Sequence, residues 1–245
     1  MGAFVDSVSS ILSRVETRTE VAAQNISNMA TPGFKRGVSF ESVVGLKAAR
    51  LPSSVATEGV AAGSGQTFAL DLSPGQLQMT GNPNDLAITG TGFFALRAES
   101  DAILYTRQGQ FKRDGDGHLV TTRGAVLQQR GGGDLVLRPG AFTVLTDGTV
   151  IQAGEATGRI AIADFQDPDS LQYAENGLYS APEATVSFMD DASISQGSLE
   201  ASNVSMGVEM MTIMAALRQA QAGQHLMNTY DDLMGRAVTT FGQQG

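Results

Sequence analysis

The sequence predicts an α+β protein. Long N- and C-terminal helices pair as a coiled-coil-like domain, and an antiparallel all-β domain is inserted between them. Three observations lead to this prediction: apolar residues recur at helical spacing near both ends of the 245-residue chain, short alternating runs fill its middle, and glycine is abundant, with 29 residues. The length is sufficient for one large domain or two smaller ones.

Residues 3 to about 29 are predicted to form the first helix. Its apolar positions recur at spacings of three, four and seven residues, which is typical of a heptad seam, and they include Val8, Ile11, Val15, Ala22 and Ile26. The helix must end by Thr31, because Pro32 disfavours α geometry in the residue before it. The following Pro-Gly pair fits the two central positions of a type II turn.

Residues 203 to about 240 are predicted to form the second helix, with Asn203 or Ser205 as its N-cap. One apolar stripe contains Met206, Met210, Ile213, Leu217 and Met227. A second stripe contains Val204, Val208, Met211, Ala215 and Ala222. Together the stripes are too wide for a helix that lies on one sheet, so the simplest partners of both terminal helices are each other or copies of the same chain. The first stripe and the N-terminal seam are therefore the candidate subunit interface.

The middle of the chain is predicted to be β-rich. Alternating or β-rich runs start at Asp85, Phe93, Ile103, His118, Ala125, Leu135, Phe142, Thr149 and Gly158, and Gly, Asp or Asn residues separate them. Strands this short and closely spaced indicate an antiparallel unit. We therefore expect three parts: a terminal-helix domain of residues 1–30 and 203–245, an extended connecting segment of residues 31–75, and a β-rich outer domain of residues 76–202.

Composition excludes several classes of function. Lys and Arg number 16 against 25 Asp and Glu, and the resulting charge of −9 argues against nucleic acid or an anionic membrane surface as the main partner. The absence of Cys excludes a thiol nucleophile and a disulfide scaffold. No run of 18 apolar residues predicts a membrane span, and the N-terminus lacks the features of a cleavable secretory signal.

Motifs for catalysis or metal binding are weak. The run from Asp114 to His118 resembles the start of a calcium loop, but no Glu closes such a loop, so a hairpin turn is favoured. We find no nucleophile paired with a base and expect no catalytic residue, metal site or cofactor. Two other classes stay open: an adhesin- or carbohydrate-type β-rich binding module, which would need exposed aromatic residues, and a hydrolase that uses paired carboxylates.

Four sequence blocks, in order over almost the whole chain, carry a resemblance to a known family. They are Asn25-Ile26-Ser27-Asn28-Met29-Ala30-Thr31-Pro32-Gly33-Phe34-Lys35, Gly81–Phe94, Tyr105–Thr121 and Gly197–Val204. Their pattern resembles that of bacterial flagellar rod and hook proteins. The positions selected as the family signature are Asn25, Asn28, Thr31, Gly33, Phe34, Asn82, Pro83, Asp85, Leu86, Gly92, Phe93, Phe94, Leu199, Glu200, Ser202, Asn203 and Val204.

The resemblance implies a structural subunit of the flagellar basal-body rod that polymerises through its terminal helices and has no enzymatic activity. Its implied partners are copies of itself, other rod and hook-family proteins, and the flagellar type III export apparatus, through which it passes without a cleavable signal. The chain length and the single β domain resemble those of a proximal rod subunit, with a distal rod or hook-family homologue as the alternative. The terminal helices are expected to become ordered on assembly. Asn25 and Asn28 are expected to adopt left-handed geometry at the helix end.

Overall fold

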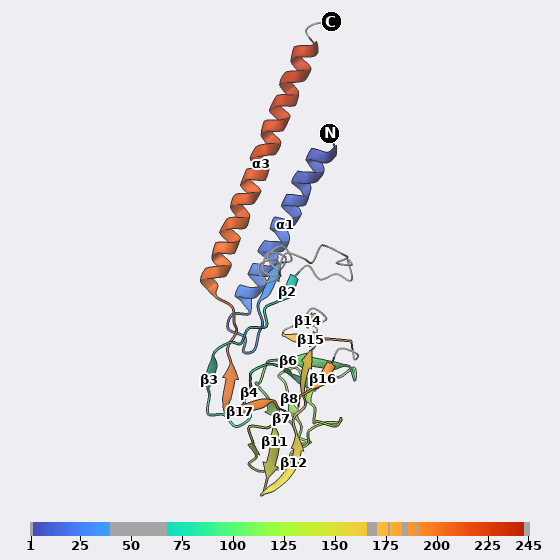
Figure 1. Ribbon diagram of the computed structural model, residues 1–245, viewed down its shortest axis with the longest axis vertical. Helices are drawn as coiled ribbons and strands as arrows, with labels where there is room; N and C mark the ends of the chain where they lie inside the picture. Colours follow the sequence, from blue (N-terminus) through green and yellow to red (C-terminus); the bar gives the residue numbers. More distant parts are fainter. Residues whose placement is uncertain are drawn as a thin grey trace, which may run out of the picture. The chain divides into compact units, whose positions relative to one another are not determined.

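The computed structural model describes residues 2–39, 68–165, 171–175, 177–182, 186–189 and 191–242 (Figure 1). The chain divides into two compact units. The helical unit is built from residues 1–27, 37–68 and 205–245, and the β unit from residues 28–36 and 69–204. Most of the predicted connecting segment, residues 40–67, lies outside the described residues.

The helical unit contains α1 (Gly2–Ser27), β1 (Gly37–Ser39) and α3 (Met206–Gly242), while β2 (Phe68–Leu70) lies where the chain passes into the β unit. Both predicted terminal helices are therefore confirmed. The helices α1 and α3 lie alongside and contact each other (Figure 1). Among the described residues, neither helix is long and apolar enough to cross a membrane.

The two helices bury different kinds of side chain. On α1, the buried apolar residues are Val8, Val15, Val21 and Ala22. On α3, the buried positions are Glu209, Ala216 and Gly223, which follow one another at intervals of seven residues along one face. Ala216 and Gly223 on this face allow close approach of a neighbouring backbone, whereas Met206, Met210, Met211 and Leu217 stay exposed.

The β unit is antiparallel, as predicted. Its strands among the described residues are β3 (Leu77–Met79), β4 (Leu86–Thr89), β5 (Phe93–Arg97), β6 (Ile103–Thr106), β7 (Lys112–Arg113), β8 (Leu119–Val120), β9 (Val126–Leu127), β10 (Thr143–Val144), β11 (Thr149–Gln152), β12 (Glu155–Arg159), β13 (Ile162–Phe165), β14 (Gln172–Glu175), β15 (Leu178–Ser180), β16 (Val186–Phe188), β17 (Ser193–Gln196) and β18 (Ser198–Glu200). The largest sheet has the order β14-β15-β6-β5-β9-β8-β7, and β13 pairs with both β5 and β16. Short ladders join β17 to β4, β18 to β3, and β10 and β12 to β11.

The β unit contains two apolar clusters, and successive residues of β5 point into different ones. Phe94, Leu96 and Leu127 are fully buried in one apolar cluster. Phe93 contributes to a second cluster, where its ring meets the Tyr179 ring edge-on at a centroid distance of 5.8 Å. Successive residues of β5 thus enter opposite layers, as the two-residue period of a strand requires.

Two local expectations are wrong. Residues 135–137 form no regular strand, although Leu135 and Leu137 are buried, because the pairing there is limited to isolated bridges. Asn25 and Asn28 are not left-handed: among the described non-glycine residues, only Asp101 and Ala153 have a positive φ. Asn25 instead forms hydrogen bonds through its side chain, and Asn28 accepts one through its carbonyl group.

Candidate functional site

The structure brings three of the four signature blocks together in one part of the β unit. We call this part the junction, and it comprises residues 28–36, 71–75, Arg107 and 198–204. The predicted turn is present in it: the N–H of Phe34 donates to the Thr31 carbonyl over 3.3 Å, and Gly33 has a φ of 69°. A Cβ on Gly33 would lie 2.3 Å from the backbone of Arg107, so both the conformation and the close approach require glycine here.

A buried charge cluster occupies the centre of the junction. The Lys35 Nζ lies 2.6 Å from Glu200 Oε1, and Arg107 Nη1 lies 3.2 Å from Glu200 Oε2. The three side chains are only 1–4% exposed. The cluster therefore holds two cations and one carboxylate away from water, and a buried pair of this kind is costly to break from one side.

Backbone groups also form hydrogen bonds with the cluster. Lys35 Nζ also donates to the Ser73 carbonyl over 2.8 Å, and the N–H of Gly75 donates to Glu200 Oε1 over 2.8 Å. The guanidinium of Arg107 donates to the carbonyls of Ile88 and Gly90 and lies 5.4 Å from the centre of the Phe93 ring. These contacts leave Glu200 as the acidic group that directly pairs both cations.

Burial affects the titration of both cations. It lowers the pKa of the Lys35 ammonium, while the hydrogen bond and the charge of Glu200 oppose this shift. It also lowers the pKa of Arg107, and the charge of Glu200 again opposes the change, with a smaller contribution from Asp164. The carboxylate is thus what keeps the two charged forms favourable inside the protein.

Signature asparagines tie backbone segments together. In the helical unit, the Asn25 side chain donates to the Gly37 carbonyl and accepts from the Gly37 N–H, each over 2.8 Å. In the junction, Asn203 Oδ1 accepts from the N–H of Arg36 over 2.8 Å, and its Nδ2 donates to the carbonyls of Asp71 and Ser73. Asn203 therefore does not cap α3; Ser205 is the residue that immediately precedes that helix.

The second signature block forms a polar turn before β4. Asp85 is buried and accepts hydrogen bonds from Thr80 Oγ1 over 2.7 Å and from Asn82 Nδ2 over 3.1 Å. Its carbonyl accepts from the N–H of Gly197 over 2.8 Å. This turn thus attaches the beginning of β4 to the segment that leads into the C-terminal helix.

The other signature residues have structural positions. Leu86, Phe93, Phe94, Phe34 and Leu199 belong to the buried residues of the β unit, and Gly92 has a φ of 102°. Asn28 accepts a hydrogen bond from Thr31, and Ser202 accepts one from the N–H of Val204. Asn82 and Pro83 are exposed. Within the described part of the chain, these residues hold turns and strands in place.

The predicted helical seam is distributed over different faces. On α1, Val8, Val15 and Ala22 are buried, while Ile11 and Ile26 are half-buried. On α3, Ile213 is half-buried, but Met206, Met210, Leu217 and Met227 are 36–52% exposed. Met211, Met214, Leu226 and Leu233 add further exposed apolar area to this helix.

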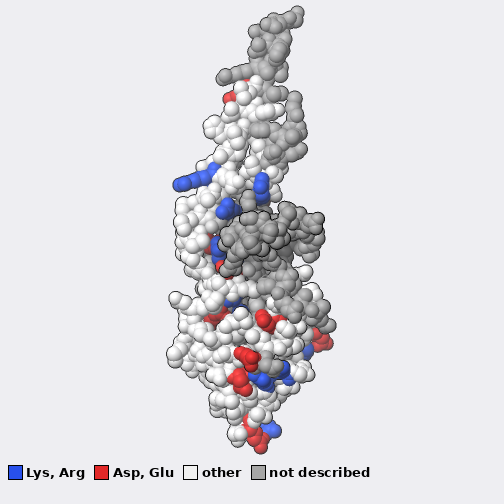
Figure 2. All heavy atoms as spheres, viewed as in Figure 1, with Lys and Arg blue, Asp and Glu red and all other residues white. Residues whose placement is uncertain are grey.

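Charged side chains are sparse on the described face of the helical unit in Figure 2. On α3 the charged residues are Glu209, Arg218, Asp231, Asp232 and Arg236. A long helix with few charges and many exposed methionine and leucine side chains is unusual for a surface that remains in water. The exposed apolar surface of α3 is the second candidate site.

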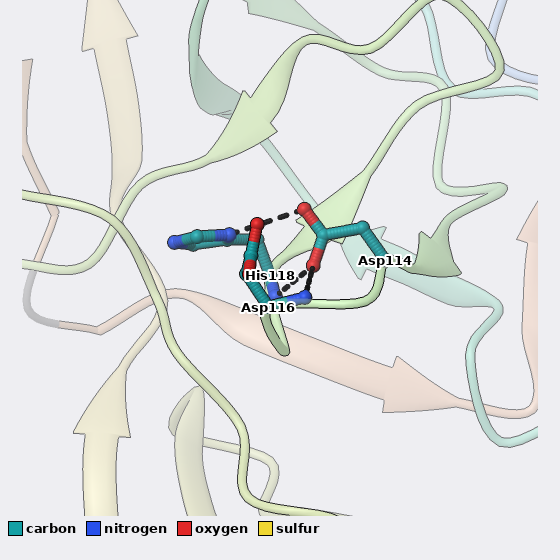
Figure 3. Close-up of side chains that lie close together, drawn as sticks. All are labelled: Asp114, Asp116 and His118. Carbon is teal, nitrogen blue, oxygen red and sulfur yellow. Dashed lines mark hydrogen bonds and ion pairs between the residues drawn. The ribbon is translucent and has the colours of Figure 1, made fainter.

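The Asp114–His118 segment is a hairpin turn between β7 and β8, as favoured from the sequence (Figure 3). Asp114 Oδ1 accepts from the N–H groups of Asp116 and His118 over 3.0 and 2.8 Å, and His118 Nδ1 lies 3.1 Å from Asp114 Oδ2. Partial burial is the largest single influence on the pKa of Asp114, and it raises this pKa. The hydrogen bonds from His118 and Asp116 together outweigh it, so the pKa of Asp114 is lowered. The Asp114 carboxylate therefore holds the hairpin turn in place.

A neighbouring ion pair stabilises the same region. Asp134 accepts from Arg97 Nη2 over 2.6 Å and from Gln128 Nε2 over 2.6 Å. The hydrogen bond from Arg97 is the main reason that the pKa of Asp134 falls to about 2. Asp134 and Asp101 in turn raise the pKa of Arg97.

Sequence reasoning missed two members of the junction. Lys35 and Arg107 lie inside the signature blocks, but their sequence positions do not mark them as site residues. A positively charged residue with no nearby acidic partner in sequence gives no sign that it is buried. The signal available was indirect: Lys35 and Glu200 each follow an apolar residue, Phe34 and Leu199, inside a signature block.

Comparison with known proteins agrees with the family resemblance that the four sequence blocks carry. The family model "Flagellar hook protein FlgE/F/G D1 domain" matches residues 87–171, and "Flagellar basal body rod FlgEFG protein C-terminal" matches residues 195–240. The flagellar basal-body rod protein FlgF of Mesorhizobium japonicum is 30% identical over 94% of each chain, and FlgF of Caulobacter vibrioides is 31% identical over 91% of each. The rod protein FlgG of Bacillus subtilis is 30% identical over 91% of this chain and 93% of its own. The chain described here belongs to the family of flagellar basal-body rod proteins that includes FlgF and FlgG.

Proposed function

We propose that this chain, a structural subunit of the bacterial flagellar basal-body rod, polymerises through its terminal helices. The observation that carries the proposal is the exposed apolar surface of α3. A helical tube needs subunits whose apolar helix faces are completed by neighbouring copies, and α3 retains such faces after it has packed against α1.

The exposed apolar residues of α3 form two stripes. We call the first the methionine stripe, and it comprises Met206, Met210, Met214 and Leu217, with the half-buried Ile213 beside them. The second stripe comprises Val208, Met211, Leu226 and Leu233. With about 100° of rotation per residue, the stripes lie on opposite sides of the buried row that contains Ala216 and Gly223. Two separate stripes support contact with two neighbouring helices.

This arrangement favours an open polymer over a closed dimer. An isologous dimer would use the same patch on both copies and would leave the second stripe in water. Contacts between unlike patches repeat from one subunit to the next and build a helical assembly. The heptad spacing on α1 and α3 supports coiled-coil-like packing among these helices, and their apolar faces support ordering on assembly.

The proposed partners are copies of this chain and other rod and hook-family proteins, in the basal body. The proposed route to that place is the flagellar type III export apparatus, without a cleavable signal. We assign the chain no catalytic activity, since its relatives are rod proteins. Its length supports a proximal position in the rod.

Site-specific labelling tests the proposed assembly surface. The chain has no cysteine, so a single Leu217→Cys introduces a unique thiol. We expect a maleimide to label this thiol rapidly in the purified subunit and slowly in isolated basal bodies. Glu155→Cys, at an exposed position of the β unit, serves as the control for access of the reagent. Equal labelling of Leu217→Cys in the subunit and in basal bodies would contradict the proposal.

A further inference from the structure

The charge cluster of the junction joins parts of the chain that are distant in sequence. Lys35 and Glu200 are 165 residues apart, and Arg107 and Glu200 are 93 residues apart. The backbone follows the same pattern, because the N–H of Gly33 donates to the Glu200 carbonyl over 2.7 Å and the N–H of Arg36 donates to Asn203. The segments 28–36 and 198–204 are therefore the first and last segments of the β unit in sequence, and they meet in space.

The three charges cannot be buried separately. Lys35 and Arg107 are 1% and 4% exposed, and their other close partners are the neutral carbonyls of Ser73, Ile88 and Gly90. Asp71 and Asp164 act on these cations as charges without a direct ion pair to either. Until Glu200 arrives, packing the surrounding core would leave two cations without a counter-ion, which a low-dielectric interior strongly disfavours.

We propose that Glu200 is a folding latch: the β unit completes its core only when segments 28–36 and 198–204 are both present and Glu200 pairs with Lys35 and Arg107. The biological meaning of the latch rests on the proposed function. A subunit that is threaded unfolded through a channel, in either direction, lacks one of these two end segments until nearly the whole β unit has passed. The latch would then keep a partly exported β unit from folding.

The latch differs from an ordinary stabilising ion pair in the step at which it acts. If the core cannot close without Glu200, the cluster is formed in the folding transition state, and loss of the carboxylate slows folding. If the cluster forms after the core has closed, loss of the carboxylate mainly accelerates unfolding. Refolding and unfolding rates of the full chain therefore separate the two cases.

The experiment uses the purified full-length chain, unfolded and refolded in urea. The chain has no Trp, so the buried Tyr105 and Tyr179 report folding of the β unit by tyrosine fluorescence. For Glu200→Gln we expect refolding to slow about tenfold or more, with the unfolding rate changed about threefold or less. Glu155→Gln removes an exposed carboxylate from the same unit and should leave both rates unchanged.

Two more variants keep the test decisive. If Glu200→Gln is too unstable to refold, Glu200→Asp retains the charge on a shorter side chain and should still slow refolding more than it accelerates unfolding. In the Glu200→Gln background, Lys35→Met removes one unpaired cation and should recover part of the lost refolding rate. Refolding of both Glu200 variants at the original rate, with only faster unfolding, would overturn the latch. Because no rod is needed, this outcome is separate from any failure of the assembly proposal.

Discussion

Replacing Leu217 with Asp tests whether the methionine stripe is a contact between subunits. Leu217 is 52% exposed, so about half of its side chain is still available for burial. Full burial of a leucine side chain is worth about 1.5–3 kcal/mol, and the exposed half therefore contributes about 1 kcal/mol per contact on assembly. The Asp variant loses this contribution and also places an unpaired carboxylate against apolar neighbours, at a cost of several kcal/mol.

The two terms together correspond to subunit association that is about 100-fold weaker or more, since each 1.4 kcal/mol is a factor of ten. Stability of the isolated subunit should change by only about 0.5 kcal/mol, because the position is exposed before assembly. The assay is complementation of a strain that lacks the gene. The chain is quantified in purified basal bodies, and its level in cells and in the export fraction is measured in parallel.

The matched control is His225→Asp, which introduces the same charge on α3 at an exposed position opposite the row of Ala216 and Gly223. We expect basal bodies with nearly normal amounts of the control variant and little or none of Leu217→Asp, while both are made and exported. Normal incorporation of Leu217→Asp would refute the assignment of the stripe to an interface.

Three further predictions concern the rest of the molecule. Gly109→Ala should destabilise the β unit by about 3 kcal/mol or more in urea unfolding, because its Cβ would lie 1.5 Å from the Leu86 carbonyl oxygen of β4. The control Gly115→Ala has open space around it and should be nearly neutral in the same measurement. Asp134 has its pKa lowered from 3.8 to about 2, so its contribution is complete above pH 4 and is lost as the pH falls towards 2. After screening this amounts to about 1 kcal/mol, and Asp134→Asn should remove that part of the pH dependence of unfolding. Replacing His118 and His225 with Ala together should leave motility intact, and a loss of swimming despite normal rods would contradict a purely structural role.

The sequence by itself determined the features that depend on neighbouring residues. Heptad spacing was sufficient for both terminal helices, because apolar periodicity reflects the geometry of one element. The Pro32-Gly33 turn and the hairpin turn at Asp114 were also evident, since few residue types tolerate those backbone conformations. The signature blocks identified the family without any three-dimensional information. The strands after residue 171 were less apparent, because their alternation is weak.

Only the tertiary structure decided which faces and which charges meet. Periodicity marks the apolar faces of α3, but it does not show that the row of Ala216 and Gly223 is buried while Leu217 stays exposed. That choice depends on how closely two backbones can approach, which small side chains permit. The same is true of Glu200, whose partners are 93 and 165 residues away in sequence. A charge is tolerated inside a protein only when an opposite charge is brought to it, and long-range chain folding is what supplies that partner.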